Sequence, residues 1–361
     1  MLDWVKNKLD KIDELYPKAE IEKRKDRISR LWTGKPPLDR YPFTYINFMF
    51  CTYNDVHTPE ERLKITLDET IVRAALDDDY IPSVFPGCRT ASMPTMFGAE
   101  EIRMGDDYSA KKIIFSYEDV DKLPEPVLKP GSVAYEWLEF QKKVIDLTDG
   151  RIPVHITDMQ GPVDVAASLW GYDNLFVAAY ERPDYYHKIM GKVTRAFIMF
   201  WKAQRDLLGD LFVPTHLFGW NWAPKELGAT LSADSLVMVS GEFFDEFYKP
   251  YIEEIGRDFG NLCIHSCGDF SQTVKTMKNI SCLRGINASE MSIEQLMDAG
   301  LDESIVAVTC TGVGSTEDIF DLVRKNSLRV DLSIWLNPVG MAEDEIKRVN
   351  DTVIGSAQLR S

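Results

Sequence analysis

The stretch Leu262-Cys263-Ile264-His265-Ser266-Cys267-Gly268-Asp269 is an apolar run that stops at a histidine and a cysteine and then turns at a glycine. Alternate residues of a strand point to the same side, so the side chains of His265 and Cys267 can approach a common atom. Imidazole and thiolate together are ligands that favour zinc. The stretch therefore predicts a strand that carries two metal ligands at its end.

Two later apolar runs also end in residues that can bind a metal. Residues 283–288 precede Glu290, and residues 305–309 precede Cys310. Consecutive parallel strands of a barrel bring their carboxyl ends to one mouth. We therefore expect Glu290 and Cys310 to complete a metal site with the first two ligands.

A simpler explanation exists for each residue of this site. His265 could cap a backbone carbonyl beside a buried Cys267. Glu290 could stand at a helix N-terminus, where acidic side chains are favoured, and Cys310 could be a small residue at a strand end. The sequence leaves these alternatives open.

Apolar runs typical of strands alternate with amphipathic runs along most of the chain. Helical periodicity appears near residues 60–77, 163–208, 242–259, 270–279, 292–299, 316–327 and 341–354. The strand-like runs are residues 43–48, 80–85, 153–157, 211–215, 262–265, 283–288, 305–309 and 330–336. This alternation predicts an α/β fold, a (β/α)8 TIM barrel, although an open doubly wound sheet has the same local pattern.

The amino-terminal segment has a different pattern from the rest of the chain. Residues 1–33 are amphipathic with helical spacing, and Gly34-Lys35-Pro36-Pro37 ends them. We expect a helical extension over residues 1–38 and a single barrel domain over residues 39–361. Within the barrel, residues 86–150 look irregular and predict a long insertion.

Composition excludes several classes of protein. The formal net charge of −16 comes without a basic stripe, which argues against nucleic-acid binding. No apolar run approaches the ~20 residues that span a bilayer, and no export or import leader is evident. The 6 cysteines are sparse for 361 residues, which is typical of reduced thiols rather than a disulfide framework. We expect a cytoplasmic protein; its oligomeric state is not indicated.

Three stretches of the chain carry a resemblance to a known family. In their order and spacing the chain resembles the uroporphyrinogen decarboxylase-like superfamily, and within it the branch of zinc-dependent corrinoid methyltransferases. The first stretch is Gly161-Pro162 with Ala167, Leu169, Gly171 and Arg182-Pro183-Asp184; the second is Asp234 with Ser240, Phe244, Glu246-Phe247 and Pro250-Tyr251; the third is His265-Ser266-Cys267-Gly268.

The resemblance implies a set of metal ligands. In the methyltransferase branch, residues at the places of His265 and Cys267 bind zinc, and Glu290 sits where an additional carboxylate ligand is often found. The branch usually has a final cysteine after the last strand. That region here reads Ile334-Trp335-Leu336-Asn337-Pro338, so Cys310, one strand earlier, is the expected substitute.

The resemblance also implies an activity. We expect zinc-dependent transfer of a methyl group between a methylcorrinoid, carried by a partner protein, and a small acceptor such as a thiol. Zinc would lower the pKa of the thiol and so hold it as thiolate at neutral pH. One alternative is a metal-independent decarboxylase or lyase that acts on a carboxylated substrate. Another is a non-catalytic corrinoid- or porphyrin-binding barrel.

The decarboxylase branch fits the sequence less well. Its members grip the carboxylates of the substrate with an arginine-rich segment after the first strand, where this chain has residues 47–54 without arginine. Its catalytic aspartate after the second strand is absent, since Phe85-Pro86-Gly87-Cys88-Arg89 occupies that place. A substrate with several carboxylates calls for more than one cation.

Further candidates follow other strand ends. Two are assigned catalytic roles: His216 as a general base or as the partner of a ligand, and Asp234 as a group that orients substrate or a ligand. The aromatic run 215–222 could line a pocket or pack against the extension. The expected substrate-binding residues are Tyr53, Arg89, Trp220 and Asn221.

Three expectations concern structure rather than function. His155 lies inside a strand and is expected to be a hydrogen-bonded core residue. The run Asp77-Asp78-Asp79 is expected to be a solvated helix end. The cysteines that lack metal-ligand spacing are expected to be buried fillers; these are Cys51, Cys88, Cys263 and Cys282.

Overall fold

The centre of the molecule is a sheet of parallel strands. The computed structural model of the chain describes residues 1–46, 58–105, 107–215, 221–288 and 290–359. All neighbouring pairs of the six-stranded sheet are parallel. Its order is β1 (Phe43–Ile46), β10 (Arg329–Trp335), β9 (Val306–Gly312), β8 (Leu283–Ala288), β7 (Leu262–Ser266) and β6 (Ala229–Ser232).

A second parallel pair continues this sheet around the axis. It consists of β4 (Val154–His155) and β5 (Phe212–Val213). Single parallel bridges join Gln160 to Ser232 of β6 and Val84 to Val154 of β4. The Asp79 amide then donates a hydrogen bond of 2.9 Å to the Phe43 carbonyl of β1. These contacts connect the two parallel sheets in the order of a barrel, in agreement with the predicted α/β barrel architecture.

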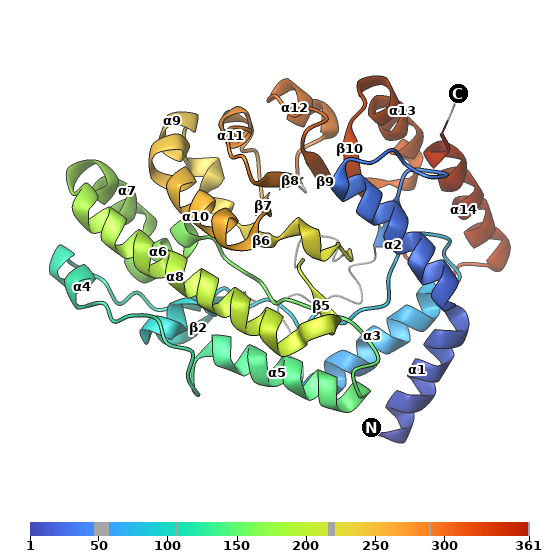
Figure 1. Ribbon diagram of the computed structural model, residues 1–361, viewed down its shortest axis with the longest axis horizontal. Coiled ribbons are helices and arrows are strands. Elements are labelled where there is room, and N and C mark those ends of the chain that lie inside the picture. Colours follow the sequence, from blue (N-terminus) through green and yellow to red (C-terminus); the bar gives the residue numbers. More distant parts are fainter. Residues whose placement is uncertain (47–57, 106, 216–220, 289, 360–361) are drawn as a thin grey trace.

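Helices surround the strands (Figure 1). A small antiparallel hairpin, β2 (Glu101–Met104) and β3 (Asp107–Ala110), lies outside the ring. The helices are α1 (Asp3–Leu15), α2 (Lys18–Thr33), α3 (Pro59–Arg73), α4 (Tyr117–Lys122), α5 (Val133–Thr148), α6 (Pro162–Trp170), α7 (Tyr172–Glu181), α8 (Pro183–Leu208), α9 (Gly241–Phe243), α10 (Lys249–Phe259), α11 (Ser271–Met277), α12 (Ile293–Asp298), α13 (Thr316–Asn326) and α14 (Glu343–Ala357). Among the helices described, none combines the length and apolar character that crossing a membrane requires.

Local sequence explains where individual helices begin. Helix α3 starts at a capping box, in which Thr58 accepts from the Glu61 amide and the Glu61 carboxylate accepts from the Thr58 amide. Pro59 at the first helical position has no amide hydrogen to leave unpaired. Helix α8 also begins with a proline, Pro183, and buries a stripe of apolar residues along its length.

Helix α2 packs against the strands through its carboxyl-terminal half. Ile28, Leu31 and Trp32 form a buried cluster with Cys263 of β7 and with residues of β9. A Cβ at Gly285 of β8 would lie 2.7 Å from both the Trp32 ring and the Cys263 sulfur. Glycine at this position is therefore what lets the indole approach the sheet.

Three parts of the chain differ from what the sequence predicts. Residues 86–150 are not merely an insertion, because they contain the long helix α5, which packs between α3 and α8 as a barrel helix. The strand β6 was not expected, since its four residues follow a Gly228 turn and carry no distinctive alternation. The expected strand at residues 80–85 is reduced to the bridge at Val84.

In the acidic run before Tyr80, Asp77 is exposed as expected, but the other two residues are not solvated. Asp78 and Asp79 are 2% and 0% exposed. Arg27 donates to one oxygen of Asp79, and Arg40 donates to the other at 2.6 Å. Arg73 donates to Asp78 at 3.3 Å. The two carboxylates are therefore buried because cations from α2, α3 and the segment before β1 neutralise them.

The expectation for His155 is confirmed. The side chain is 1% exposed, its Nε2 lies 2.8 Å from the Ser83 hydroxyl, and its Nδ1 lies 2.7 Å from the Thr215 carbonyl. Of the cysteines expected as fillers, Cys263 is fully buried, Cys88 and Cys282 are half-buried, and Cys51 lies outside the described residues.

Candidate metal centre

Three possible metal ligands converge after β6 and β7. Ser232 at the end of β6 pairs with His265 near the end of β7, so the residues that follow both strands are neighbours. One ligand atom each from Asp234, His265 and Cys267 lies within 4.8 Å of the others. The Cys267 sulfur is 3.4 Å from His265 Nε2, which is 3.7 Å from Asp234 Oδ1. These three residues form the candidate metal centre.

Backbone contacts hold the two strand ends together. The Cys267 amide donates to Asp234 Oδ1 at 3.0 Å, and the Ser235 amide donates to the Asp164 carboxylate at 3.1 Å. Asp164 lies in the first turn of α6, and Ser235 lies in the 3-10 helix Asp234–Met238. The Cys267 amide therefore holds the Asp234 carboxylate, and Asp164 holds the backbone that follows it.

The orientation of the imidazole is determined by Asn287 of β8. The Asn287 side-chain amide donates to the Val308 carbonyl at 3.1 Å, so its oxygen faces the other way, toward His265 Nδ1 at 2.6 Å. The Nδ1–H must then be the donor in that contact. The free lone pair of the neutral ring lies on Nε2, which faces Asp234 and Cys267. Outer partners of this kind orient histidine ligands at metal sites.

Electrostatics at the centre determine the protonation of two of the possible ligands, Cys267 and His265. Partial desolvation raises the pKa of the Cys267 thiol to about 12, and the negative charges of Asp234 and Glu290 act in the same direction. Burial lowers the pKa of His265, against smaller opposing effects of Asp234 and Asn287. At neutral pH the imidazole is therefore neutral and ready to coordinate, while the thiol stays protonated until a metal displaces its proton.

The donor set fits zinc. Nitrogen, sulfur and oxygen ligands at tetrahedral sites are typical of zinc, and a catalytic site keeps a fourth position open. The side chain of Asp234 is 44% exposed and Cys267 is exposed, so the centre is accessible from outside. Three protein ligands with an accessible side are the arrangement that catalytic rather than structural zinc sites have.

Glu290 and Cys310 are not part of this three-residue group. Glu290 Oε2 accepts a hydrogen bond of 3.1 Å from the Gly268 amide, so the carboxylate lies next to the centre and supports the turn after Cys267. Cys310 of β9 lies opposite Ser333 of β10, and burial raises the pKa of its thiol. Among the described residues, the third possible ligand is therefore Asp234, whereas the sequence led us to expect Glu290 and Cys310.

The other candidate residues fall into two groups. Tyr53, His216 and Trp220 lie outside the described residues. Arg89 donates to both oxygens of Glu101 and to Glu136 at 2.6 Å, so its charge is already paired with carboxylates.

Asn221 is buried and donates to Asp331 at 3.0 Å and to Ser333 at 3.2 Å. Its neighbour Trp222 packs against the buried cluster that includes α2.

Sequence reasoning missed two buried acids beside the centre. Asp158 accepts from Gln160 at 2.8 Å and from Ser232 at 3.4 Å, and burial together with Asp234 raises its pKa to about 6. Burial likewise raises the pKa of Asp164 to about 7, with a further contribution from Asp234. The sequence does carry a signal for Asp158, because this carboxylate follows the apolar run 153–157. Glu290 was chosen as a candidate for the same reason, since it follows the apolar run 283–288.

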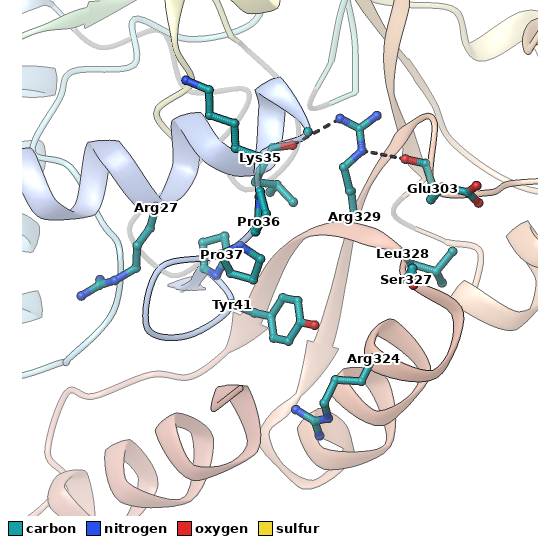
Figure 2. Close-up of a pocket in the computed structure, with 13 residues that line it drawn as sticks. Arg27, Lys35, Pro36, Pro37, Tyr41, Glu303, Arg324, Ser327, Leu328 and Arg329 are labelled. Carbon is teal, nitrogen blue, oxygen red and sulfur yellow. Dashed lines mark hydrogen bonds between the residues drawn. The ribbon is translucent and has the colours of Figure 1, made fainter. Parts of the chain in front are cut away.

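A separate cavity of about 610 Å³ lies between the end of α2 and the segment around α13 and β10. Figure 2 shows that the charged ends of its basic side chains point in different directions. Arg329 donates to the Leu31 and Glu303 carbonyls, and Arg27 is paired with Asp39 and Asp79. The cations therefore do not converge on a common ligand, and none of the lining residues belongs to the metal centre.

Comparisons with known proteins agree with this architecture. Residues 91–216 match the family model described as uroporphyrinogen decarboxylase (URO-D). The fold is similar to that of a methyltransferase from Methanosarcina mazei, with a TM-score of 0.64 and 16% sequence identity over 92% of this chain and 98% of that chain. No curated protein sequence matches the chain. The family match and the shared fold together confirm the resemblance of this chain to the uroporphyrinogen decarboxylase-like superfamily.

Proposed function

We propose that this chain is a zinc-dependent methyltransferase that moves a methyl group between a corrinoid, carried by a partner protein, and a small acceptor such as a thiol. The observation that carries the proposal is the convergence of Asp234, His265 and Cys267 within 4.8 Å, after two neighbouring strands of the barrel. The similar fold of a methyltransferase supports this choice of chemistry.

The residues of the centre have distinct tasks in this proposal. Asp234, His265 and Cys267 would hold the metal, and bound zinc would lower the pKa of an incoming thiol so that its sulfur becomes nucleophilic at neutral pH. Asn287 keeps His265 Nε2 turned toward the other ligands. The exposed side of the centre admits the acceptor and the methyl donor. His216 as a general base, and Tyr53 and Trp220 as substrate contacts, stay predictions.

One observation favours a decarboxylase instead, namely the match of residues 91–216 to the uroporphyrinogen decarboxylase model. That chemistry would need cations to grip the carboxylates of a substrate. The matched region includes the contact partners of Arg89, but the guanidinium is occupied by Glu101 and Glu136. The described part of the site thus offers three possible metal ligands rather than a carboxylate clamp.

Metal analysis tests the proposal most simply. The wild-type protein, expressed with ample zinc, is expected to hold about one zinc ion per chain, because three ligands are in place. A Cys267→Ser variant is expected to lose most of it. Cys282→Ser is the matched control, since Cys282 is a half-buried free cysteine outside the group. Wild-type protein without zinc would contradict the proposal.

Transfer itself is tested by the absorption change of methylcobalamin when a thiol is added. We expect the change with wild-type protein and with Cys282→Ser, and at least a 100-fold slower change with Cys267→Ser. An unchanged rate in Cys267→Ser would remove the metal centre from the reaction and would favour metal-independent chemistry.

A further inference from the structure

We propose that a second cavity, remote from the metal centre, binds a free small molecule that has an apolar chain and one negatively charged end, as a fatty acid has. The cavity has a volume of about 540 Å³ and is lined by residues of α1 and α2 and by residues that precede strands of the barrel. Small-molecule sites in proteins have volumes of about 300–1,000 Å³ and mostly apolar walls with a few polar groups, so the size is suitable.

The cavity and the metal centre lie at opposite ends of the strands. On the barrel side, the cavity is lined by Pro153, which directly precedes β4, and by Leu211, which directly precedes β5. Asp234 and Cys267 instead follow the carboxyl-terminal ends of β6 and β7. Because these strands run parallel, the two sites face opposite ends of the barrel. Binding in the cavity therefore requires no metal.

The floor of the cavity is apolar and belongs to the packed core. Leu9 and Ile12 of α1, together with Ile81, are at most 4% exposed. Ile21 of α2 and Leu211 are only half-buried, so part of their apolar surface is still open to solvent. The walls are therefore in place before a ligand binds, and a hydrocarbon chain that covers them would be stabilised by the hydrophobic effect.

Most polar groups around the cavity already have partners. The Tyr16 hydroxyl donates to the Thr70 carbonyl at 2.9 Å. Arg151 forms ion pairs with Asp10 at 2.8 Å and with Asp13 at 2.6 Å. These groups help to shape the cavity but do not offer a free charge to a ligand.

Lys18 differs from the other basic residues of the cavity. Lys25 is paired with Glu22 at 3.1 Å, whereas the Lys18 ammonium group is exposed and forms no ion pair or hydrogen bond within the part of the chain that the structure describes. Lys18 is also the first residue of α2, and the positive end of a helix favours an anion. One positive charge beside an apolar floor is complementary to a ligand with one negative end.

Isothermal titration calorimetry with the zinc-loaded full-length protein tests this complementarity. The ligands are octanoate, 1-octanol and octylamine, which share a chain and differ in the charge of one end. We expect one octanoate per chain, with a Kd below about 1 mM, and affinity that falls in the order given. Hexanoate is expected to bind about tenfold more weakly than octanoate, because two fewer methylene groups are buried.

Four variants locate the binding. Lys18→Glu is expected to weaken octanoate about fivefold or more and to leave 1-octanol unchanged. Lys35→Glu, an exposed lysine that lines the other cavity, is the matched control and should bind both as the wild type does. Ile21→Asp should weaken all the ligands, with thermal unfolding used to verify the fold. Cys267→Ser should bind octanoate like the wild type.

The outcomes separate this inference from the proposed function, since none of them measures zinc content or methyl transfer. Loss of octanoate binding in Cys267→Ser would place the carboxylate on the metal and overturn the inference. Equal effects of Lys18→Glu and Lys35→Glu would overturn it too. So would an affinity that does not depend on chain length, or several weak sites per chain, because either result is that of adventitious binding.

Discussion

At the scale of single residues, Asn287 decides which nitrogen of His265 can coordinate a metal. It is fully buried, and each end of its side-chain amide has one defined partner. Asn287→Ala is expected to lower zinc affinity by about 10- to 100-fold, because the imidazole loses its orientation. Competition with a chromophoric chelator measures the affinity. The control is Asn326→Ala on α13, which removes a hydrogen bond to the Leu322 carbonyl within the same helix.

The same titration decides the outcome. Equal zinc affinities of Asn287→Ala and the wild type would mean that the ring is held by the fold alone. A loss in Asn326→Ala of the same size would mean that the effect is one of general stability.

His155 makes a prediction about acid stability. Burial lowers its pKa to about 4, against 6.5 in the unfolded chain, so the folded protein binds this proton less readily. The contribution of His155 to the free energy of unfolding is fully present above pH 6.5. It is lost as the pH falls toward 4, and the loss amounts to up to about 3 kcal/mol. Denaturant unfolding of the wild type and His155→Gln, at several pH values, measures it.

The wild type is expected to lose more stability than His155→Gln between pH 6.5 and 4. The raised pKa values of Asp158, Asp164 and Asp331 act in the opposite direction with pH, but they are present in both proteins and cancel in the difference. Parallel pH dependences of the two proteins would exclude a buried neutral His155.

Sequence reasoning at this scale succeeds where the signal is local. His265 and Cys267 are two residues apart in one strand, and the alternation of side chains is enough to bring them together. Asn287 carries no such signal, since a polar residue inside an apolar run does not reveal its partner. The buried state of Asp79 depends on Arg27 and Arg40, which are distant in sequence.

At the scale of elements, two helix glycines have opposite surroundings. A Cβ at Gly256 of α10 would lie 2.1 Å from the Cys282 sulfur, whereas a Cβ at Gly355 of α14 would meet nothing within 4 Å. Gly256→Ala is expected to destabilise the fold by about 1–3 kcal/mol through overpacking. Gly355→Ala is expected to stabilise it by up to about 1 kcal/mol through helix propensity. Thermal unfolding compares the two; shifts of the same sign would contradict this packing of α10.

The strand β6 shows why the site was only partly foreseen. Its four residues Ala229–Ser232 are too short and too small to stand out from the preceding loop. Asp234 was therefore noticed for its resemblance to a family motif, without a strand to place it next to His265. The pairing of Ser232 with His265 is what brings the third ligand into the centre.

At the scale of the whole molecule, buried ion pairs attach the amino-terminal helices to the barrel. Asp79 is 0% exposed and binds Arg27 of α2, Arg40, and the Phe43 amide of β1. Asp79→Asn is expected to cost about 3–5 kcal/mol, because two guanidinium groups lose their buried counter-charge. Urea unfolding measures the loss of stability.

A surface carboxylate provides the comparison for this prediction. Asp344 of α14 is 80% exposed and pairs with Arg348 at 3.5 Å. Asp344→Asn should change stability by less than about 0.5 kcal/mol. Similar effects of the two substitutions would show that the buried network does not attach α2 to the barrel.

The architecture as a whole was more predictable than the site. Strand-like and helical runs alternate over most of the chain, and that order predicts an α/β fold with a parallel sheet regardless of the exact strand ends. The identity of the third ligand depends on how two strand ends approach each other in space. The final cysteine expected from the family is absent, and the alternation of apolar residues does not indicate that Asp234 replaces it.

The most direct test of the account is X-ray diffraction from crystals of the zinc-loaded protein, recorded on both sides of the zinc absorption edge. The account predicts one anomalous peak within coordination distance of Asp234, His265 Nε2 and the Cys267 sulfur, with Cys310 outside the coordination sphere. A zinc-loaded crystal with no peak at these three residues, or with its peak elsewhere, would contradict it.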